Sequence, residues 1–236
     1  MDGVWKRRLK RTAFAVGLVV LFFIIQYDLN ENETWTTWSL PLSGKVILLD
    51  PGHGGVDGGA GDRPMQEKDI ALSISLKLRD FLQQQGAIVI MTRETDKDLA
   101  PVDMKGYSRR KAADLKERIK IINESNADLF ISIHLNAIPS PQWSGAQTFY
   151  NSKRKENAKA AKLIQQELRI NLENTTRKAK PLNNLYILKH ADSQGVLVEA
   201  GFLSNPTEKA NLERDSYQEM VAASIYKGII RYYTKK

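Results

Sequence analysis

Apolar residues recur along most of this chain in two alternating patterns. Short runs rich in β-branched residues and closed by turn-forming residues are typical of buried strands, whereas apolar positions three and four residues apart are typical of amphipathic helices. The first pattern predicts strands at 45–50, 87–92, 129–135, 146–150, 185–189 and 196–200. The second predicts helices at 67–85, 107–123, 156–172 and 215–233.

This order of elements predicts the fold class. Strands that alternate with helices favour an α/β domain with a mostly parallel central sheet of about six strands and helices on both faces. In such sheets the ligand site lies outside the carboxyl ends of the strands. Residues that follow or end the predicted strands are therefore the first candidates for chemistry.

The N-terminal segment follows neither pattern. Five basic residues precede an uninterrupted apolar run at 13–25, which with its flanks spans roughly 20 to 25 Å as a helix. This segment could be a signal peptide, a membrane anchor or a core helix. No small-x-small cleavage pattern follows Ile25, so an uncleaved anchor is favoured. The basic flank would stay in the cytoplasm and the rest of the chain would lie outside.

These observations divide the chain into two parts. Residues 1–43 are expected to form a cytoplasmic basic tip, a membrane anchor or signal segment, and a linker in which Trp35 and Trp38 lie near the membrane surface. Residues 44–236 are expected to form one catalytic domain, because this length supports a single sizeable core.

Charge and composition limit the classes of molecule that the chain is expected to bind and the chemistry that it can use. The formal net charge is +8, and without the N-terminal basic cluster and Asp2 it is about +4. That mild excess suits an anionic polymer such as a cell wall, and equally an ordinary solvated surface. No nucleic-acid-binding motif is found, so no nucleic acid partner is expected. Cysteine is absent, which excludes disulfides, thiolate metal ligands and a catalytic thiol.

Four polar residues stand out beside the apolar runs. His53 follows the first predicted strand in a glycine-rich loop, Glu67 begins a predicted helix, His134 ends the third strand and Glu199 ends the sixth. Two imidazoles and a carboxylate make a metal site of N, N and O donors, and a further carboxylate beside it can move protons. This set predicts a zinc hydrolase.

Each of these residues has a simpler explanation. His53 could be a turn residue in a phosphate-binding loop, although neither the P-loop nor the dinucleotide-binding pattern is present. Glu67 could be an acid that favours the first turn of a helix, His134 a hydrogen-bonded core residue, and Glu199 part of a structural salt bridge. The third histidine, His190, is expected in a surface loop.

Taken together, the segments that contain these residues resemble a known family. LLDPGHGGVDGGA, EKD, MTRETD, SRRKAADL, ISIHLNA and VEAGFLSN are similar in order and spacing to segments of the zinc-dependent N-acetylmuramoyl-L-alanine amidases called amidase 3. The likeness spans about 44–233. Further segments, LAPVDMKGYSRRKA, WSGAQTFY and LENTTRKAK, are similar to the germination-specific members in endospore-forming bacteria, which act on spore cortex peptidoglycan.

The resemblance implies a role for each candidate. His53, Glu67 and His134 would bind one Zn²⁺, and Glu199 would be catalytic. The substrate would be peptidoglycan, with its stem peptide and glycan, and the reaction would precede a separate muramic acid deacetylase that leads to muramic δ-lactam. The catalytic domain would lie outside the cytoplasm, in the forespore intermembrane space.

Two substrate-binding hypotheses concern other residues. Asn136 shares the strand face of His134 by the period-two rule, and either Asn136 or the backbone near His134 is expected to bind the substrate amide. Arg93 is expected to contact stem-peptide carboxylates or wall glycan, unless it pairs with Glu94 or Asp96.

The connection after the third strand is informative. Only 138–145 intervenes before the next strand, too short for the inhibitory helix that some members of the family carry there. An open groove is expected, although an accessory activator protein could still be needed to load zinc.

Three other functions remain open. Two histidines and one carboxylate also form the facial triad of non-haem iron oxygenases. The chain could instead be a catalytically inactive wall-binding module, or a zinc deacetylase of wall sugars. Metal analysis distinguishes the first, and the products released from wall distinguish the other two.

Overall fold

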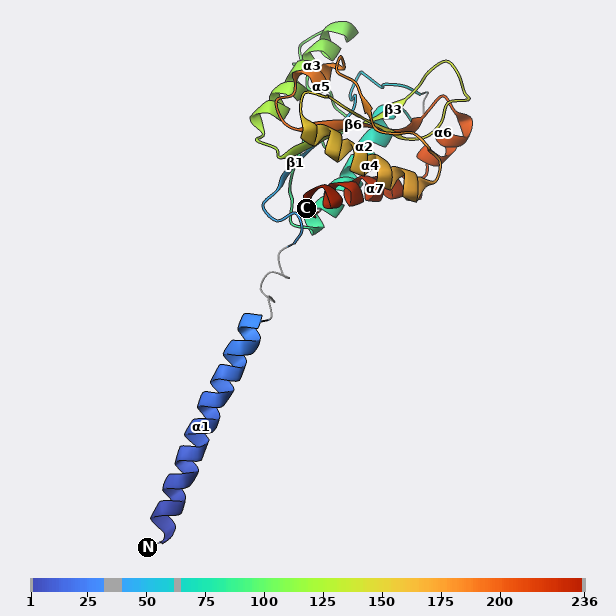
Figure 1. Ribbon diagram of the computed structural model, residues 1–236. Helices are drawn as coiled ribbons and strands as arrows, with labels where there is room; N and C mark the ends of the chain where they lie inside the picture. The colour runs from blue at the N-terminus through green and yellow to red at the C-terminus, as the bar shows by residue number, and fades with distance from the viewer. Residues whose placement is uncertain (1, 32–39, 62–64, 235–236) are drawn as a thin grey trace. The chain divides into compact units, whose positions relative to one another are not determined.

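The computed structural model describes residues 2–31, 40–61 and 65–234, and the chain divides into two compact units, 1–40 and 41–236 (Figure 1). The described part of the first unit is one helix, α1 (Asp2–Glu31). The predicted linker aromatics, Trp35 and Trp38, lie outside the described residues.

α1 is long and apolar enough to cross a membrane between Trp5 and Tyr27, a stretch of 23 residues. A rise of 1.5 Å per residue gives this stretch a length of about 34 Å, compared with ~30 Å for the hydrocarbon core of a bilayer. The sequence-based length of 20 to 25 Å was too short, because the helix continues on both sides of the apolar run. A signal sequence meets the same criteria of length and composition.

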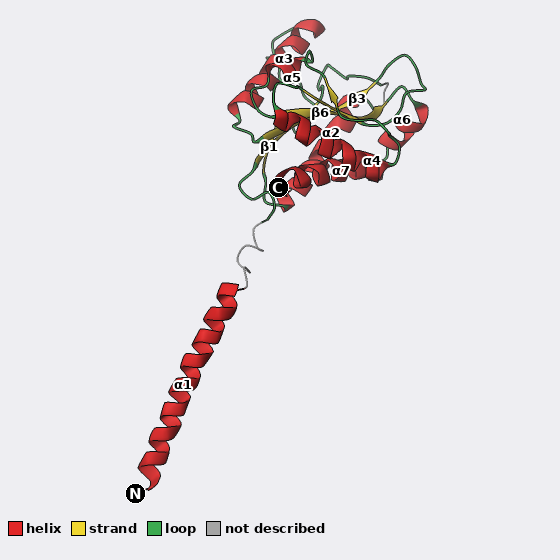
Figure 2. Cartoon of the chain, in the orientation of Figure 1, coloured by secondary structure: helices red, strands yellow, loops and turns green. Residues whose placement is uncertain are grey.

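The second unit is built around a six-stranded sheet (Figure 2). Its strands lie in the order β2-β1-β3-β6-β4-β5, and β4 pairs antiparallel with β6 while the other pairs are parallel. The strands are β1 (Val46–Pro51), β2 (Ile88–Met91), β3 (Leu129–Asn136), β4 (Gln147–Tyr150), β5 (Lys180–Pro181) and β6 (Gly195–Phe202).

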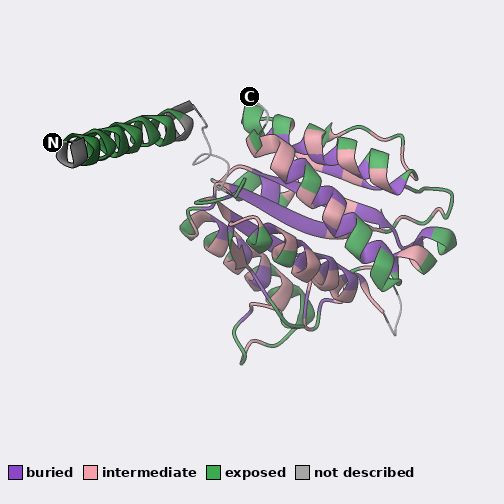
Figure 3. Ribbon diagram, turned by 90° about the horizontal axis from the view of Figure 1, so that it is seen from below, coloured by how far each residue is buried: buried purple, intermediate pink, exposed green. Residues whose placement is uncertain are grey.

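Helices cover both faces of this sheet. Along β1, Ile47 and Leu49 belong to a large apolar core and Leu48 to a smaller one, as expected for a strand buried on both sides. Figure 3 shows buried strands between helices whose outer surfaces are exposed. The helices that enclose the large core are α2 (Glu67–Gln84), α4 (Lys155–Leu172) and α7 (Asp215–Thr234), while α3 (Tyr107–Glu124) and α5 (Tyr186–His190) enclose the smaller one. The predicted α/β class is confirmed.

Three elements differ from the sequence-based prediction. The segment expected to be the fifth strand, 185–189, is helix α5, and the fifth strand of the sheet is instead the two-residue β5. Ile187 and Leu188 are both buried, which adjacent residues of a half-buried strand would not be, and Tyr186 stacks on His190 one turn later. A short helix that was not expected, α6 (Pro206–Leu212), begins where the Asn205 side chain accepts a hydrogen bond from the Glu208 amide.

The strand order brings three predicted site segments to one edge. β3 lies between β1 and β6, so the loop after β1 and the carboxyl-terminal ends of β3 and β6 are neighbours. His134 is the direct partner of Glu199 across the β3–β6 pair, and the register shifts immediately after it. Such irregularities re-aim side chains next to functional sites.

Candidate active site

His53, Glu67 and His134 form the group of candidate metal-binding side chains in the described part of the chain, with one ligand atom from each within 4.8 Å of the others. Glu67 Oε1 lies 3.2 Å from His53 Nε2 and 3.0 Å from His134 Nδ1. Donor atoms about 2.0 to 2.1 Å from a tetrahedral ion lie roughly 3.3 Å apart. The three side chains therefore fit a single divalent transition metal.

Two glycines leave the space that the candidate ligands His134 and Glu67 occupy. A Cβ atom on Gly52 would lie 2.4 Å from the His134 imidazole, and one on Gly59 would lie 2.5 Å from Glu67 Oε2. Neither position accepts a larger residue without displacing a candidate ligand. His53 itself has a positive φ of 59°, a conformation that non-glycine residues adopt rarely and that clusters at functional sites.

Glu67 is held by the backbone as well as by the histidines. Its side chain is 4% exposed at the N-terminus of α2, and it accepts hydrogen bonds from the amides of Ala60 at 2.8 Å and Leu135 at 3.0 Å. Burial raises the pKa of Glu67, but His134 and His53 outweigh it and hold the pKa well below its usual range. The carboxylate is therefore ionised and oriented towards both imidazoles.

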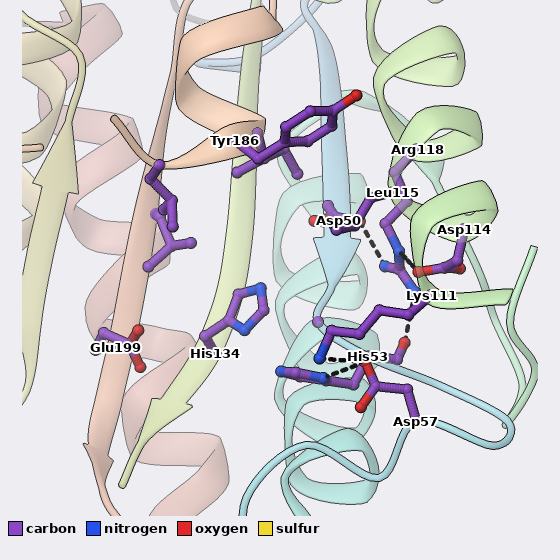
Figure 4. A pocket seen from close by; sticks show the side chains of 14 residues that line it. Asp50, His53, Asp57, Lys111, Asp114, Leu115, Arg118, His134, Tyr186 and Glu199 are labelled. Carbon is purple, nitrogen blue, oxygen red and sulfur yellow. Dashed lines mark hydrogen bonds and ion pairs between the residues drawn. The ribbon is translucent and has the colours of Figure 1, made fainter. Parts of the chain in front are cut away.

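Asp57 orients His53 from the side opposite to Glu67. The His53 Nδ1 atom is 2.9 Å from Asp57 Oδ2 (Figure 4). The other ring nitrogen, Nε2, is 3.2 Å from Glu67 Oε1. Burial lowers the pKa of His53, but Asp57 and Glu67 raise it to about 9. The two carboxylates thus favour a positive charge on or beside the imidazole ring. A carboxylate bonded to the second ring nitrogen is the usual way in which a metal-binding histidine is oriented.

Two further side chains fix Asp57. Tyr107 donates its hydroxyl to Oδ1 at 2.9 Å, and the Lys111 ammonium lies 3.0 Å from Oδ2. Sequence reasoning missed Asp57, Tyr107 and Lys111, although a carboxylate four residues after His53 in the same glycine-rich loop was a visible signal.

Glu199 lies beside the histidines on β6. Its Oε2 atom is buried and has no hydrogen-bond partner among the described residues. Burial raises the pKa of Glu199 to about 7. A buried carboxyl oxygen without a partner is costly in a purely structural position and is typical of groups that exchange protons with a substrate.

His53, His134 and Glu199 line a pocket of about 180 Å³ between the sheet edge, α3 and α5, together with Asp57 and Lys111. Figure 4 shows Glu199 and His134 projecting from neighbouring strands, with His53 and Lys111 on the other side of the opening. Leu115, Leu185 and Leu197 supply apolar walls. An open pocket with two imidazoles, a carboxyl group and apolar walls can bind a substrate and hydrolyse one of its polar bonds.

Arg93 has a different place from the one expected. Its side chain is 1% exposed, and its guanidinium donates to the backbone carbonyls of Pro51 at 3.1 Å and of Gly52 and Lys68 at 2.8 Å each. The suggestion that it contacts stem peptide or glycan is corrected accordingly: Arg93 holds the loop that carries His53.

A second buried arginine supports the same loop. Arg118 donates to Asp50 Oδ1 at 2.7 Å and to the carbonyls of Pro51 and His53. Burial raises the pKa of Asp50, but Arg118 and Ser132 outweigh it and lower the pKa below its usual range. These long-range contacts, from α3 to the end of β1, have no signature in the sequence.

The sequence also gave expectations for Asn136, for His190 and for the connection after β3. Asn136 and His134 are both partly exposed on β3 and Leu135 between them is buried, although the register of the β3–β6 pair shifts between the two polar residues. His190 ends α5 and is exposed, on a helix and not in a loop. Residues 137–146, between β3 and β4, contain no helix.

Comparison with known proteins agrees with this geometry. Residues 47–231 match the family model Amidase_3, described as N-acetylmuramoyl-L-alanine amidase. The chain belongs to this family, and it is an enzyme that hydrolyses the amide bond between N-acetylmuramic acid and L-alanine in peptidoglycan.

Individual relatives agree with the family match. The chain is 57% identical over 231 residues to the germination-specific N-acetylmuramoyl-L-alanine amidase of Bacillus subtilis, covering 98% of both chains. Its fold matches the CwlD amidase of Clostridioides difficile, solved in complex with the GerS lipoprotein, with a TM-score of 0.79 and 41% identity over 82% of this chain and all of the other. An N-acetylmuramoyl-L-alanine amidase from Clostridium difficile 630 matches with a TM-score of 0.70 and 29% identity, over 81% of this chain and 98% of the other.

Proposed function

We propose that this chain is a zinc amidase that removes stem peptides from muramic acid in spore cortex. The observation that carries the proposal is the convergence of His53, Glu67 and His134 beside the unpaired carboxyl group of Glu199. Two imidazole nitrogens and one carboxylate oxygen are one of the donor sets that hold catalytic zinc. The 57% identity to a germination-specific amidase supports the cortex as the substrate.

The residues divide the chemistry between them. Zinc, when bound, polarises the scissile carbonyl and lowers the pKa of a water molecule towards about 7. Glu199 takes a proton from the water that attacks the lactyl carbonyl carbon. As the C–N bond breaks, Glu199 gives that proton to the nitrogen of L-alanine. Asn136, partly exposed at the end of β3, is positioned to hydrogen-bond the substrate amide.

We extend the proposal to the rest of the chain and its surroundings. α1 serves as a membrane anchor whose basic N-terminal end stays in the cytoplasm, and the unit from Pro41 onwards works outside it, in the forespore intermembrane space. The stripped muramic acid then becomes the substrate of a separate deacetylase. The solved complex of a relative with a lipoprotein supports an accessory partner for this chain as well.

Two substitutions test the division of roles. Glu199→Gln keeps the size of the side chain and removes the proton acceptor, so we expect zinc content to be retained and turnover of peptidoglycan to fall about 10²- to 10⁴-fold. His53→Ala removes a ligand, so zinc content itself is expected to fall. Metal analysis and peptide release are measured on the same preparations. Wild-type turnover in both variants would show that the roles are wrongly assigned.

A further inference from the structure

We propose that a groove next to Glu199 binds a sugar of the glycan strand adjacent to the muramic acid that is cleaved. This proposal rests on the proposed function and specifies the substrate it recognises. The groove has a volume of about 590 Å³ and lies between the β3–β4 and α4–β5 connections. We call it the Trp143 groove, and its principal lining residues are Gln142, Trp143, Ser144, Glu173, Thr176 and Arg177.

An indole held in place forms one wall of the groove. The guanidinium of Arg177 lies 5.6 Å from the Trp143 ring centre and 5.0 Å from that of Phe202. Arg177 Nε also donates to the Ser144 carbonyl at 2.9 Å. Trp143 is nevertheless 45% exposed. A large aromatic surface that is fixed from behind and open in front is suited to stacking on a ligand.

Gln147 lies between the groove and the catalytic residue Glu199. Arg177 Nη1 donates to Gln147 Oε1 at 3.3 Å, and Gln147 is the direct partner of Glu199 across the β4–β6 pair. Directly opposed residues project from the same face of a sheet, with Cβ atoms about 4.5 to 5.5 Å apart. The Trp143 groove therefore begins one side chain away from Glu199, within reach of the same polymer chain.

The charge of the lining selects the class of ligand. The lining combines one cationic side chain, Arg177, with one exposed carboxylate, Glu173, so it has no net charge that would favour an anionic ligand. Gln142 and Thr176 offer exposed neutral amide and hydroxyl groups. A neutral pyranose fits this combination, because its C–H face packs on an indole and its hydroxyl and acetamido groups hydrogen-bond to neutral polar side chains. A stem-peptide carboxylate does not.

Intrinsic fluorescence tests the binding directly. Trp5, Trp35 and Trp38 are the other tryptophans of the chain, so replacing these three with phenylalanine in the full-length protein leaves Trp143 as the only indole. Titration with a peptide-free tetrasaccharide of alternating N-acetylglucosamine and N-acetylmuramic acid should change its emission saturably. No change with the tetrasaccharide, or a change with free stem peptide only, would overturn the proposal.

Steady-state kinetics provides a second test. Trp143→Ala should raise KM for peptide-bearing glycan about tenfold and leave kcat within about twofold, while kinetics on N-acetylmuramoyl-L-alanyl-D-isoglutamine stay unchanged. Trp143→Phe should recover part of the loss. Ile170→Ala, which removes an exposed apolar side chain of α4 outside the groove, is the matched control. An unchanged KM for the polymer in Trp143→Ala would contradict the proposal.

These outcomes separate the groove from the reaction. If the proposed chemistry is wrong, Glu199→Gln keeps turnover whatever happens at Trp143. If the groove does not bind glycan, Glu199→Gln still loses turnover while Trp143 variants behave as wild type on the polymer.

Discussion

At the scale of single residues, the site depends on side chains that surround the candidate ligands. Asp57 bonds the Nδ1 edge of His53, and Arg93 and Arg118 hold the carbonyls of the loop that carries it. The sequence indicated His53, Glu67, His134 and Glu199 because polar groups there interrupt apolar runs or glycine-rich turns. It did not indicate Arg118, whose contacts to the loop form only when α3 packs against the end of β1.

Asp57 gives a prediction about metal affinity. Asp57→Asn keeps the shape of the side chain but weakens its bond to His53, so we expect zinc affinity to fall about 10- to 100-fold with the fold intact. Competition with a chelator measures the affinity, and circular dichroism checks the fold. Asp103→Asn, which removes a carboxylate from an exposed loop, is the control. Equal affinities in the two variants would show that Asp57 does not position His53.

Asp50 gives a prediction about stability and pH. The pKa of Asp50 is lower in the folded protein than in the unfolded chain, so its ionised form stabilises the fold above pH ~4, and this contribution is lost as pH falls through the folded pKa. Asp50→Asn removes one of the two carboxylates that pair with the buried Arg118 and leaves Asp114 as the other. We expect it to lower the free energy of unfolding by about 1.5 to 3 kcal/mol at pH 7.

Urea denaturation at several pH values measures this effect. The difference between wild type and Asp50→Asn should shrink as the pH is lowered below about 4, because the wild-type carboxylate is then progressively protonated. Equal unfolding free energies at pH 7 would contradict the role assigned to the Asp50–Arg118 pair.

At the scale of elements, the long periodic segments were predictable and the short ones were not. β1, β3 and β6 are continuous apolar runs, and α2, α3, α4 and α7 keep a clear helical period. The segment 185–189 offers only five residues, too few for either period to be distinguished, and burial of Ile187 and Leu188 against the smaller core decides the outcome. α6 did carry a signal that was overlooked, Asn205 followed by Pro206.

The β3–β4 connection also gives a prediction. Residues 137–146 contain no helix that could cover the pocket. We therefore expect the purified protein with added zinc to release stem peptides without a second protein, at a rate that an accessory partner raises by no more than about tenfold. Complete dependence of peptide release on a partner protein would contradict this expectation.

At the scale of the whole molecule, the chain consists of an apolar helix and one catalytic unit. If α1 is an uncleaved anchor, protein extracted from membranes keeps residues 1–27, and an external protease digests the unit from Pro41 onwards in intact cells or protoplasts. Intact-mass measurement and protease accessibility check both points. A soluble chain that begins after Tyr27 would identify α1 as a cleaved signal segment.

The products of the reaction test the central claim most directly. Purified cortex peptidoglycan is digested with the zinc-loaded protein and analysed by mass spectrometry. The account predicts stem peptides with a free L-alanine amino terminus and muramic acid that keeps its N-acetyl group, and Glu199→Gln should form these products at least about 10²-fold more slowly. Loss of acetyl groups with the peptides still attached, or no release of peptide at all, would contradict it.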